Sequence, residues 1–164
     1  MSRIDVGPVT VEIAAPEALV YQMLATIGQG AQIDGERAEI LERADDELVC
    51  DFWTRVSLPA GRDRLVRTRE RVTLFPPDRI EYEHLDGPVR GLRESITVTT
   101  TAGGTARLTY VGTYESSGTF DYLRALWLAR PVIHRAMDAH FADIRQRAEA
   151  RAKRSRVFVT EAGG

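Results

Sequence analysis

The sequence contains a single cysteine, Cys50, among its 164 residues. One thiol excludes an internal disulfide and any metal site built from several cysteines. Because no activating base stands near it in the sequence, we interpret Cys50 as a buried structural residue rather than a nucleophile. A lone cysteine is compatible with a reducing compartment, and we expect the protein in the cytoplasm.

Long apolar runs and an excess of charge of one sign are also missing. No apolar stretch approaches the roughly 20 residues that a membrane-spanning helix needs. Residues 1–5 lack the apolar run of a signal peptide. The net charge is only -2, so no overall field attracts nucleic acid or an anionic membrane. We therefore expect no transmembrane segment and no nucleic-acid partner. We expect the protein to be a monomer or a homodimer.

Motifs of common catalytic and cofactor sites are absent as well. The pair Gly28 and Gly30 lacks the third glycine and the preceding strand of a dinucleotide loop. Neither G-x-S-x-G nor a phosphate-binding loop occurs. His134 and Asp138 share a helix face, but two ligands do not make a metal site. We expect neither a metal nor a cofactor.

The residues that are present divide the chain into strands and helices. Residues 9–13 read V-T-V-E-I and alternate as a strand does. Pro16 to Ile27 has apolar residues at helical spacing, and Gly28 stops the helix. From Glu36 the period changes to two, and turn residues separate six more strands. We place these at about 36–44, 47–57, 63–75, 79–86, 92–101 and 105–115, and their short connections predict an antiparallel meander.

The C-terminal part of the chain changes character. From Phe120 to Lys153 there is no glycine and one proline, Pro131, which predicts a helix of roughly thirty residues with a kink at the proline. We expect a single ligand-binding domain over residues 1–156 and a flexible tail at 157–164. Only the long helix is large enough to cover one face of the sheet, and the gap between them is where small molecules bind.

Three segments resemble a known superfamily. They are V-T-V-E-I-A-A-P-E-A-L-V-Y-Q-M-L (9–24), L-D-G-P-V-R-G-L-R-E-S-I-T-V (85–98) and G-G-T-A-R-L-T-Y-V-G-T-Y-E (103–115). In order and spacing they are similar to polyketide cyclases and aromatases, START-like lipid-transfer domains, birch-pollen-allergen proteins and coenzyme Q-binding proteins. Many members carry an aromatic pair where this chain has Gly28-Gln29-Gly30-Ala31, which predicts a wider pocket mouth.

The resemblance implies an α+β helix-grip fold. In that fold a seven-stranded curved antiparallel sheet wraps around a long C-terminal helix, with one or two short helices after the first strand. It also implies a cavity between sheet and helix that takes an apolar or aromatic small molecule. Because one fold hosts many functions, the residues that line the cavity must decide between them.

Strand alternation selects the residues that face this cavity. Three arginines alternate with Thr68 and Glu70, and a row of arginines belongs on a solvated face. Thr68 and Glu70 should therefore point inward, and the same argument turns Tyr82 and His84 inward. The predicted ligand-binding residues are Phe52, Thr68, Tyr82, Glu94, Ile96, Tyr110 and Tyr114 from the sheet, and Arg130, Ile133, Met137 and Phe141 from the helix.

Glu70 and His84 are the candidate catalytic residues. A carboxylate that faces a half-apolar cavity should have a raised pKa, which suits acid–base chemistry on an enolisable ketone. Histidine titrates near neutrality and could shuttle protons. Structural alternatives stay open: Glu70 could pair with Arg93 or Arg130, and His84 could be a rim or capping residue.

Three functions follow as hypotheses. The first is a carrier or sensor for a lipid, quinone or polyketide-like molecule. The second is an enzyme of the polyketide cyclase or dehydratase type that uses the same cavity. The third is a macromolecular adaptor that acts through the basic segment 145–156, although cations at a helix C-terminus are also explained by the helix dipole.

Overall fold

A curved antiparallel sheet of seven strands is the framework of the computed structural model, which describes residues 1–28 and 35–162, with side chains to Arg156. Its strands are β1 (Ser2–Ile13), β2 (Arg37–Ala44), β3 (Glu47–Leu58), β4 (Arg62–Phe75), β5 (Arg79–Asp86), β6 (Arg93–Thr100) and β7 (Ala106–Ser116). Neighbours from β2 to β7 pair in chain order, and β1 pairs with β7. The predicted meander and the seven-stranded sheet are confirmed.

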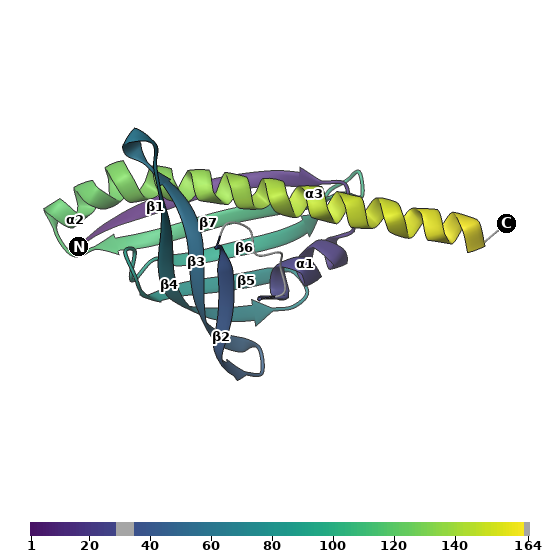
Figure 1. Ribbon diagram of the computed structural model, residues 1–164, viewed down its shortest axis with the longest axis horizontal. Helices are drawn as coiled ribbons and strands as arrows, with labels where there is room; N and C mark the ends of the chain where they lie inside the picture. Colours follow the sequence, from purple (N-terminus) through teal and green to yellow (C-terminus); the bar gives the residue numbers. More distant parts are fainter. Residues whose placement is uncertain (29–34, 163–164) are drawn as a thin grey trace.

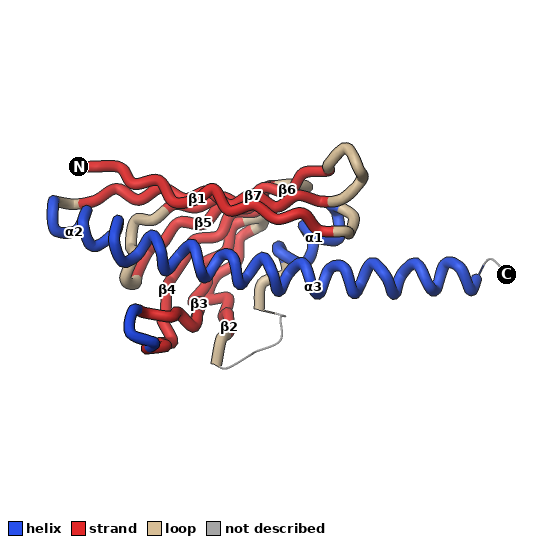
Figure 2. The backbone as a smooth tube through the Cα atoms, turned by 90° about the horizontal axis from the view of Figure 1, so that it is seen from above, coloured by secondary structure: helices blue, strands red, loops and turns tan. Residues whose placement is uncertain are grey.

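Helices cover one face of this sheet. They are α1 (Glu17–Ala25), α2 (Thr119–Arg124), the π-helical turn η2 (Ala125–Ala129) and α3 (Arg130–Ala162). The long α3 lies along the sheet beside β1 and then projects beyond the body of the molecule (Figures 1 and 2). This is the helix-grip fold that the resemblance implied. None of the helices described has the length and apolar character that crossing a membrane requires.

Alternation along the strands explains which face the helices cover. In β7 every second residue is buried, so Leu108 and Tyr110 point toward the helix side while their neighbours are more exposed. On β1 the alternation shifts at a bulge between Val6 and Val9. Gly7 adopts a φ of 92° there, and its N–H donates to His134 Nε2 over 3.1 Å. The bulge therefore ties β1 to α3.

Two element boundaries differ from the sequence-based expectation. The first strand begins at Ser2 rather than at residue 9, because its pairing with β7 continues past the bulge at Gly7. Helix α1 ends at Ala25 rather than Ile27, where the Thr26 hydroxyl donates to the Gln22 carbonyl oxygen over 2.7 Å. Such a side-chain bond to the preceding turn competes with helix continuation.

The long helix also departs from expectation around Pro131 and at its end. Proline has no N–H, and its ring collides with the carbonyl four residues back. The wider π-turn just before it absorbs this conflict, and the Arg130 N–H bonds to the Ala125 carbonyl oxygen. The helix then continues past Lys153 to Ala162. The flexibility of residues 157–164 stays a prediction, and the mouth segment Gln29–Ala31 lies outside the described residues.

The end of the helix-covered face is closed by small residues. Ala148 and Ala152 are buried one turn apart on α3, and α3 contacts α1. Val20 and Leu24 are the buried residues of α1. Short side chains let the two helices approach closely, and the space that remains between α3, α1 and the sheet forms a cavity.

Candidate functional site

A cavity of about 710 Å³ lies between the sheet, the end of α1 and α3. Its walls are apolar at Leu24, Phe52, Ile96, Met137 and Ile144. Polar and charged side chains also line the cavity. Such a combination of apolar wall and a few oriented polar groups is typical of small-molecule sites.

Four neighbouring strands place polar side chains together at the floor of the cavity. Glu70 of β4 pairs in register with His84 of β5. On β6 and β7, Glu94 and Tyr110 follow on the same inner face, because Tyr82 pairs with Glu94 and Ile96 with Tyr110. We call Glu70, His84, Glu94 and Tyr110 the floor cluster.

Short hydrogen bonds connect the floor cluster. His84 Nε2 lies 2.6 Å from Glu94 Oε2, and the Tyr110 hydroxyl donates to Glu94 Oε1 over 2.5 Å. The Thr68 hydroxyl donates to Glu70 Oε1 over 2.5 Å. On the other side of the imidazole, Nδ1 lies 3.6 Å from Glu70 Oε1. This nitrogen is buried and has no hydrogen-bond partner among the described residues.

Burial sets the protonation of these groups. Removal from water raises the pKa of Glu70, and the nearby charge of Glu94 raises it further, against the opposing effects of His84 and Thr68. Burial lowers the pKa of His84, but the hydrogen bond to Glu94 and the charges of both carboxylates outweigh it and raise the pKa overall. Burial also raises the pKa of Tyr82 and Tyr110, so both phenols stay neutral donors.

Access to the cavity differs within the cluster. Glu70, Glu94, Tyr82 and Tyr110 line it, whereas His84 is not among its lining residues. A ligand can therefore touch the carboxylates and the phenols. The imidazole reaches the two carboxylates through its two ring nitrogens.

Three side chains of the floor cluster carry atoms that can ligate a metal ion. Ligand atoms of Glu70, His84 and Glu94 lie within 4.8 Å of one another, a set that could hold a divalent ion. However, His84 Nε2 and both Glu94 oxygens are already hydrogen-bonded inside the protein. Only His84 Nδ1 and the Glu70 carboxylate remain, fewer than the three protein ligands usual in catalytic zinc sites.

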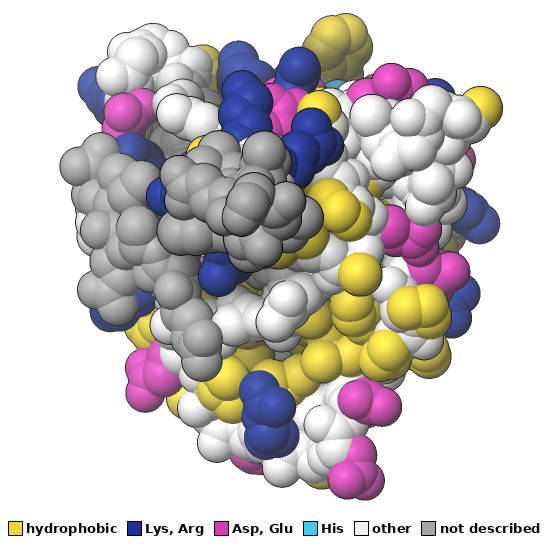
Figure 3. Space-filling model, turned by 90° about the vertical axis from the view of Figure 1, so that its right-hand side faces the viewer, with side chains coloured by type: hydrophobic (Ala, Val, Ile, Leu, Met, Phe, Trp, Pro, Cys, Tyr) yellow, Lys and Arg dark blue, Asp and Glu magenta, His cyan; other side chains and the backbone are white. Residues whose placement is uncertain are grey.

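The rim of the cavity has the opposite charge. Arg37, Arg55, Arg147 and Arg151 line it, with Glu36 and Asp143 beside them. On the side of the molecule toward which α3 projects, Lys and Arg side chains gather together with Asp and Glu side chains (Figure 3). The Arg37 guanidinium lies over the Trp53 ring, 3.9 Å from its centre.

The sequence analysis missed the helix residues of this rim. His140, Ile144, Arg147 and Arg151 follow Met137 in steps of three or four, which is one helix face. All five line the cavity. Extending the spacing from Met137 identifies these four residues. The prediction of Phe141 in place of His140 turns the predicted lining face of the helix by one residue.

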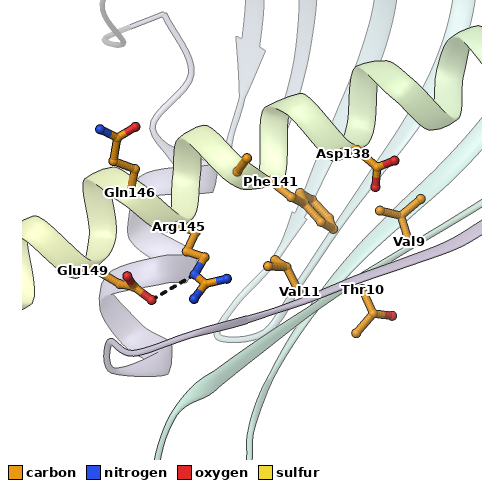
Figure 4. A pocket seen from close by; sticks show the side chains of 9 residues that line it. Val9, Thr10, Val11, Asp138, Phe141, Arg145, Gln146 and Glu149 are labelled. Carbon is orange, nitrogen blue, oxygen red and sulfur yellow. Dashed lines mark hydrogen bonds and ion pairs between the residues drawn. The ribbon is translucent and has the colours of Figure 1, made fainter.

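Phe141 itself lies on the neighbouring face of α3. It is 1% exposed and lines a separate groove between α3 and β1, beside Val9 and Val11 (Figure 4). The groove also holds the ion pair of Arg145 with Glu149. Phe141 thus closes the core on the β1 side.

The structure brings together most of the other predicted residues. Phe52, Tyr82, Glu94, Ile96, Tyr110 and Met137 line the cavity with Glu70, and Thr68 stands behind Glu70. Tyr114, Arg130 and Ile133 do not line it. The Tyr114 hydroxyl instead donates to Asp121 and receives a bond from Arg124. Their roles in ligand binding stay predictions.

The structural alternative for Glu70, an ion pair with Arg93, is not what the structure shows. Arg93 lies on the outer face of the sheet and pairs with Glu83 at 3.3 Å. The charged groups that face Glu70 are His84 and Glu94. Glu70 is thus a buried carboxylate with a histidine, not an arginine, beside it.

Comparison with known proteins identifies the class of fold. The sequence matches no protein-family model and no curated protein. Among solved structures, the chain resembles the Zhui aromatase/cyclase from Streptomyces sp. R1128, with 21% identity over 93% of this chain and 95% of that one and a TM-score of 0.65.

Two further structures agree with this class. The di-domain aromatase/cyclase BexL is 19% identical over 92% of this chain, which spans 50% of BexL, with a TM-score of 0.63. A START-superfamily protein from Mycobacterium smegmatis is 14% identical over 93% of this chain and 97% of its own, with a TM-score of 0.55. The chain thus has the helix-grip fold of aromatase/cyclases and START-superfamily proteins.

Proposed function

We propose that the protein is an acid–base enzyme of the polyketide cyclase or dehydratase type, which acts on an apolar carbonyl compound in its single helix-grip domain, residues 1–156. The observation that carries this proposal is Glu70 at the cavity floor, 3.6 Å from an imidazole that is itself bonded to a second carboxylate. A carrier needs an apolar wall but no buried proton-transfer groups.

The floor cluster supplies the steps of an aldol closure and dehydration. The Glu70 carboxylate removes a proton from the carbon beside a ketone, and the neutral Tyr82 phenol donates to the enolate oxygen. The new carbon–carbon bond forms at a second carbonyl of the same substrate. The protonated Glu70 returns its proton to the alkoxide oxygen that this step forms, which gives the aldol hydroxyl. Glu70 then removes the second proton from the same carbon and delivers it to the hydroxyl as the C–O bond breaks, so water leaves, the double bond forms and Glu70 is ionised again. General acid–base catalysis of this kind contributes about 10²–10⁴ in rate.

His84, Glu94 and Tyr110 support Glu70. An imidazolium 3.6 Å away stabilises the ionised carboxylate. The hydrogen bond from His84 to Glu94 holds the ring in place, and the bond from Tyr110 holds Glu94 in turn. The likeness to structures named aromatase/cyclases supports the same choice at the level of the fold.

The direct test is proton abstraction from an aromatic ketone. Purified protein in deuterium oxide is given α-tetralone, and exchange at the carbon beside the carbonyl is followed by proton NMR. We expect exchange above the buffer rate, and Glu70→Gln should lower it by about 100-fold. Glu83→Gln, which changes a carboxylate on the outer face of β5, is the matched control and should keep the wild-type rate.

Exchange that persists in Glu70→Gln while α-tetralone still binds would overturn the assignment of Glu70. Wild-type protein that binds the ketone tightly but never exceeds the buffer rate would instead support the second candidate, a carrier or sensor. The apolar wall of Phe52, Ile96 and Met137 favours that candidate. Native mass spectrometry of the purified protein would then show a bound small molecule.

A further inference from the structure

Charge is separated along the cavity. Its floor holds two carboxylates, Glu70 and Glu94, whereas four arginines line its rim against two acids. The floor therefore repels an anionic group and the rim attracts one. Neither a carrier for neutral lipids nor an enzyme for neutral ketones needs this separation.

The rim arginines on α3 are available to a ligand. Arg147 donates through Nε to Asp143 over 2.9 Å, the one contact of its guanidinium recorded for the described chain. Arg151, one turn further along, forms no ion pair with any residue described here. Because a guanidinium is planar and carries donors on several edges, it can bind a carboxylate or a phosphate through two parallel hydrogen bonds.

The opposite side of the rim is shaped to meet such a group. The guanidinium carbon of Arg37 lies over the Trp53 ring, 3.9 Å from its centre. Stacking of this kind leaves the edge of the cation free to donate hydrogen bonds. Trp53 is two residues from Asp51 on β3 and pairs with Arg37, so both belong to the outer face of the sheet at its edge, and they add positive charge at the outer margin of the cavity that Arg147 and Arg151 line.

The length of the cavity matches a ligand with two distinct ends. From Met137 to Arg151 the lining covers 15 residues of α3, a rise of about 21 Å along an α-helix. One end of an extended molecule can therefore reach the floor cluster while the other stays at the rim. Repulsion at the floor and attraction at the rim fix which end enters first.

We infer that the ligand of this protein is an amphipathic anion, bound with its carboxylate or phosphate group on Arg147 and Arg151 at the rim and its apolar, carbonyl-bearing part at the floor. The inference deepens the proposed function and rests on it for the reacting end. The rim itself makes a prediction about binding that holds whether or not the floor is catalytic.

Two dyes of similar shape test the inference. The anionic 8-anilino-1-naphthalenesulfonate and the neutral N-phenyl-1-naphthylamine differ by one sulfonate, and fluorescence titration gives the dissociation constant of each. We expect the double variant Arg147→Gln/Arg151→Gln to bind the anionic dye about tenfold more weakly and the neutral dye within about twofold of wild type. Lys153→Gln/Arg154→Gln, which removes two charges from the same helix outside the cavity lining, is the matched control and should leave both constants unchanged.

Competition then identifies the head group. Dodecanoate and dodecyl phosphate should displace the neutral dye from wild-type protein more strongly than dodecanol does, and the better of the two acids shows which group the rim prefers. Equal competition by dodecanol overturns the inference, as does an equal loss of both dyes in the Arg147→Gln/Arg151→Gln variant. The titrations are repeated in Glu70→Gln. Rim-dependent binding there, without ketone exchange in wild type, would refute the proposed chemistry and leave the anion site standing.

Discussion

Asp51 and Glu70 are two buried carboxylates on opposite faces of the same pair of strands. Asp51 is 5% exposed and Glu70 is 8% exposed. Asp51 pairs in register with Arg69, and its neighbour Cys50 pairs with Glu70. Adjacent register positions thus place one carboxylate on the outer face and one on the cavity face.

Their surroundings move their pKa values in opposite directions. Arg69 donates two hydrogen bonds to Asp51, at 2.8 and 3.0 Å, and Arg67 donates a third. These bonds lower the pKa of Asp51 despite its burial. The groups that act on Glu70 are the Thr68 hydroxyl, His84 and the second carboxylate, Glu94, and burial raises the pKa of Glu70. The comparison shows that the partner, not burial alone, decides in which direction the pKa of a buried carboxylate moves.

The largest effect on the cavity side of this comparison is expected from a substitution that changes no charge. Gly112 lies opposite Glu94 on β7, and a Cβ there would stand 2.8 Å from the Tyr110 hydroxyl oxygen. Gly112→Ala should push Tyr110 away from Glu94 and lower the free energy of unfolding by about 2 kcal/mol, the cost typical of overpacking. Urea denaturation measures it.

Gly103→Ala is the control for this change. The nearest atom to a Cβ at Gly103 is 3.9 Å away, so its cost should stay within about 0.5 kcal/mol. An equal loss in both variants would show that strand flexibility, rather than the room for Tyr110, explains the effect.

Removing the charge of Asp51 on the outer face should lower the free energy of unfolding by less. Asp51→Asn removes the charge that Arg67 and Arg69 share, and we expect the free energy of unfolding to fall by about 1.5 kcal/mol at pH 7, since both arginines are partly solvated. A lowered folded-state pKa stabilises above the unfolded-state pKa and ceases to do so as the pH falls through the folded value. The gap between wild type and variant should therefore close in acid.

Asp86→Asn is the matched control, because Asp86 also bonds Arg67 but its side chain is 62% exposed. It should change the free energy of unfolding by less than about 0.5 kcal/mol. A loss in Asp51→Asn that does not shrink below pH 4 would contradict the ionic explanation.

The smallest expected effect is a gain, rather than a loss, in the free energy of unfolding. Glu70→Gln should raise the free energy of unfolding by about 1 kcal/mol at pH 8, because a buried charge that His84 matches only in part is replaced by a neutral group of the same shape. A raised folded-state pKa favours the protonated fold, so wild type loses stability as the pH rises above the usual carboxyl value of about 4.3. The gain should vanish near pH 4.

Denaturation of both proteins between pH 4 and pH 8 gives this profile. Glu83→Gln on the outer face should show no gain at any pH, since Glu83 is paired with Arg71 at 2.7 Å. Destabilisation by Glu70→Gln at pH 8 would mean that His84 fully compensates the charge, and the contrast with Asp51 would be lost.

The sequence predicted the sheet and its inner face because alternation is a local property. The row of arginines on β4 placed Thr68 and Glu70 inside, and the acids of β5 placed Tyr82 and His84 inside, as the structure has them. The helix was less accessible to the same reasoning. A helix presents several faces within a few residues, so choosing Phe141 over His140 turned the predicted lining toward β1.

By itself, the sequence determined the strands, the long helix and the side of the sheet on which each polar residue lies, since periods of 2 and 3.6 residues are written in the order of the side chains. Only the tertiary structure decided which of those residues meet. Glu70, His84, Glu94 and Tyr110 come from four strands, and their contacts depend on strand register and on the bulge between Arg69 and Glu70. The separation of an acidic floor from a basic rim arises in the same way, because α3 is held on β1 and turns Arg147 and Arg151 toward the cavity.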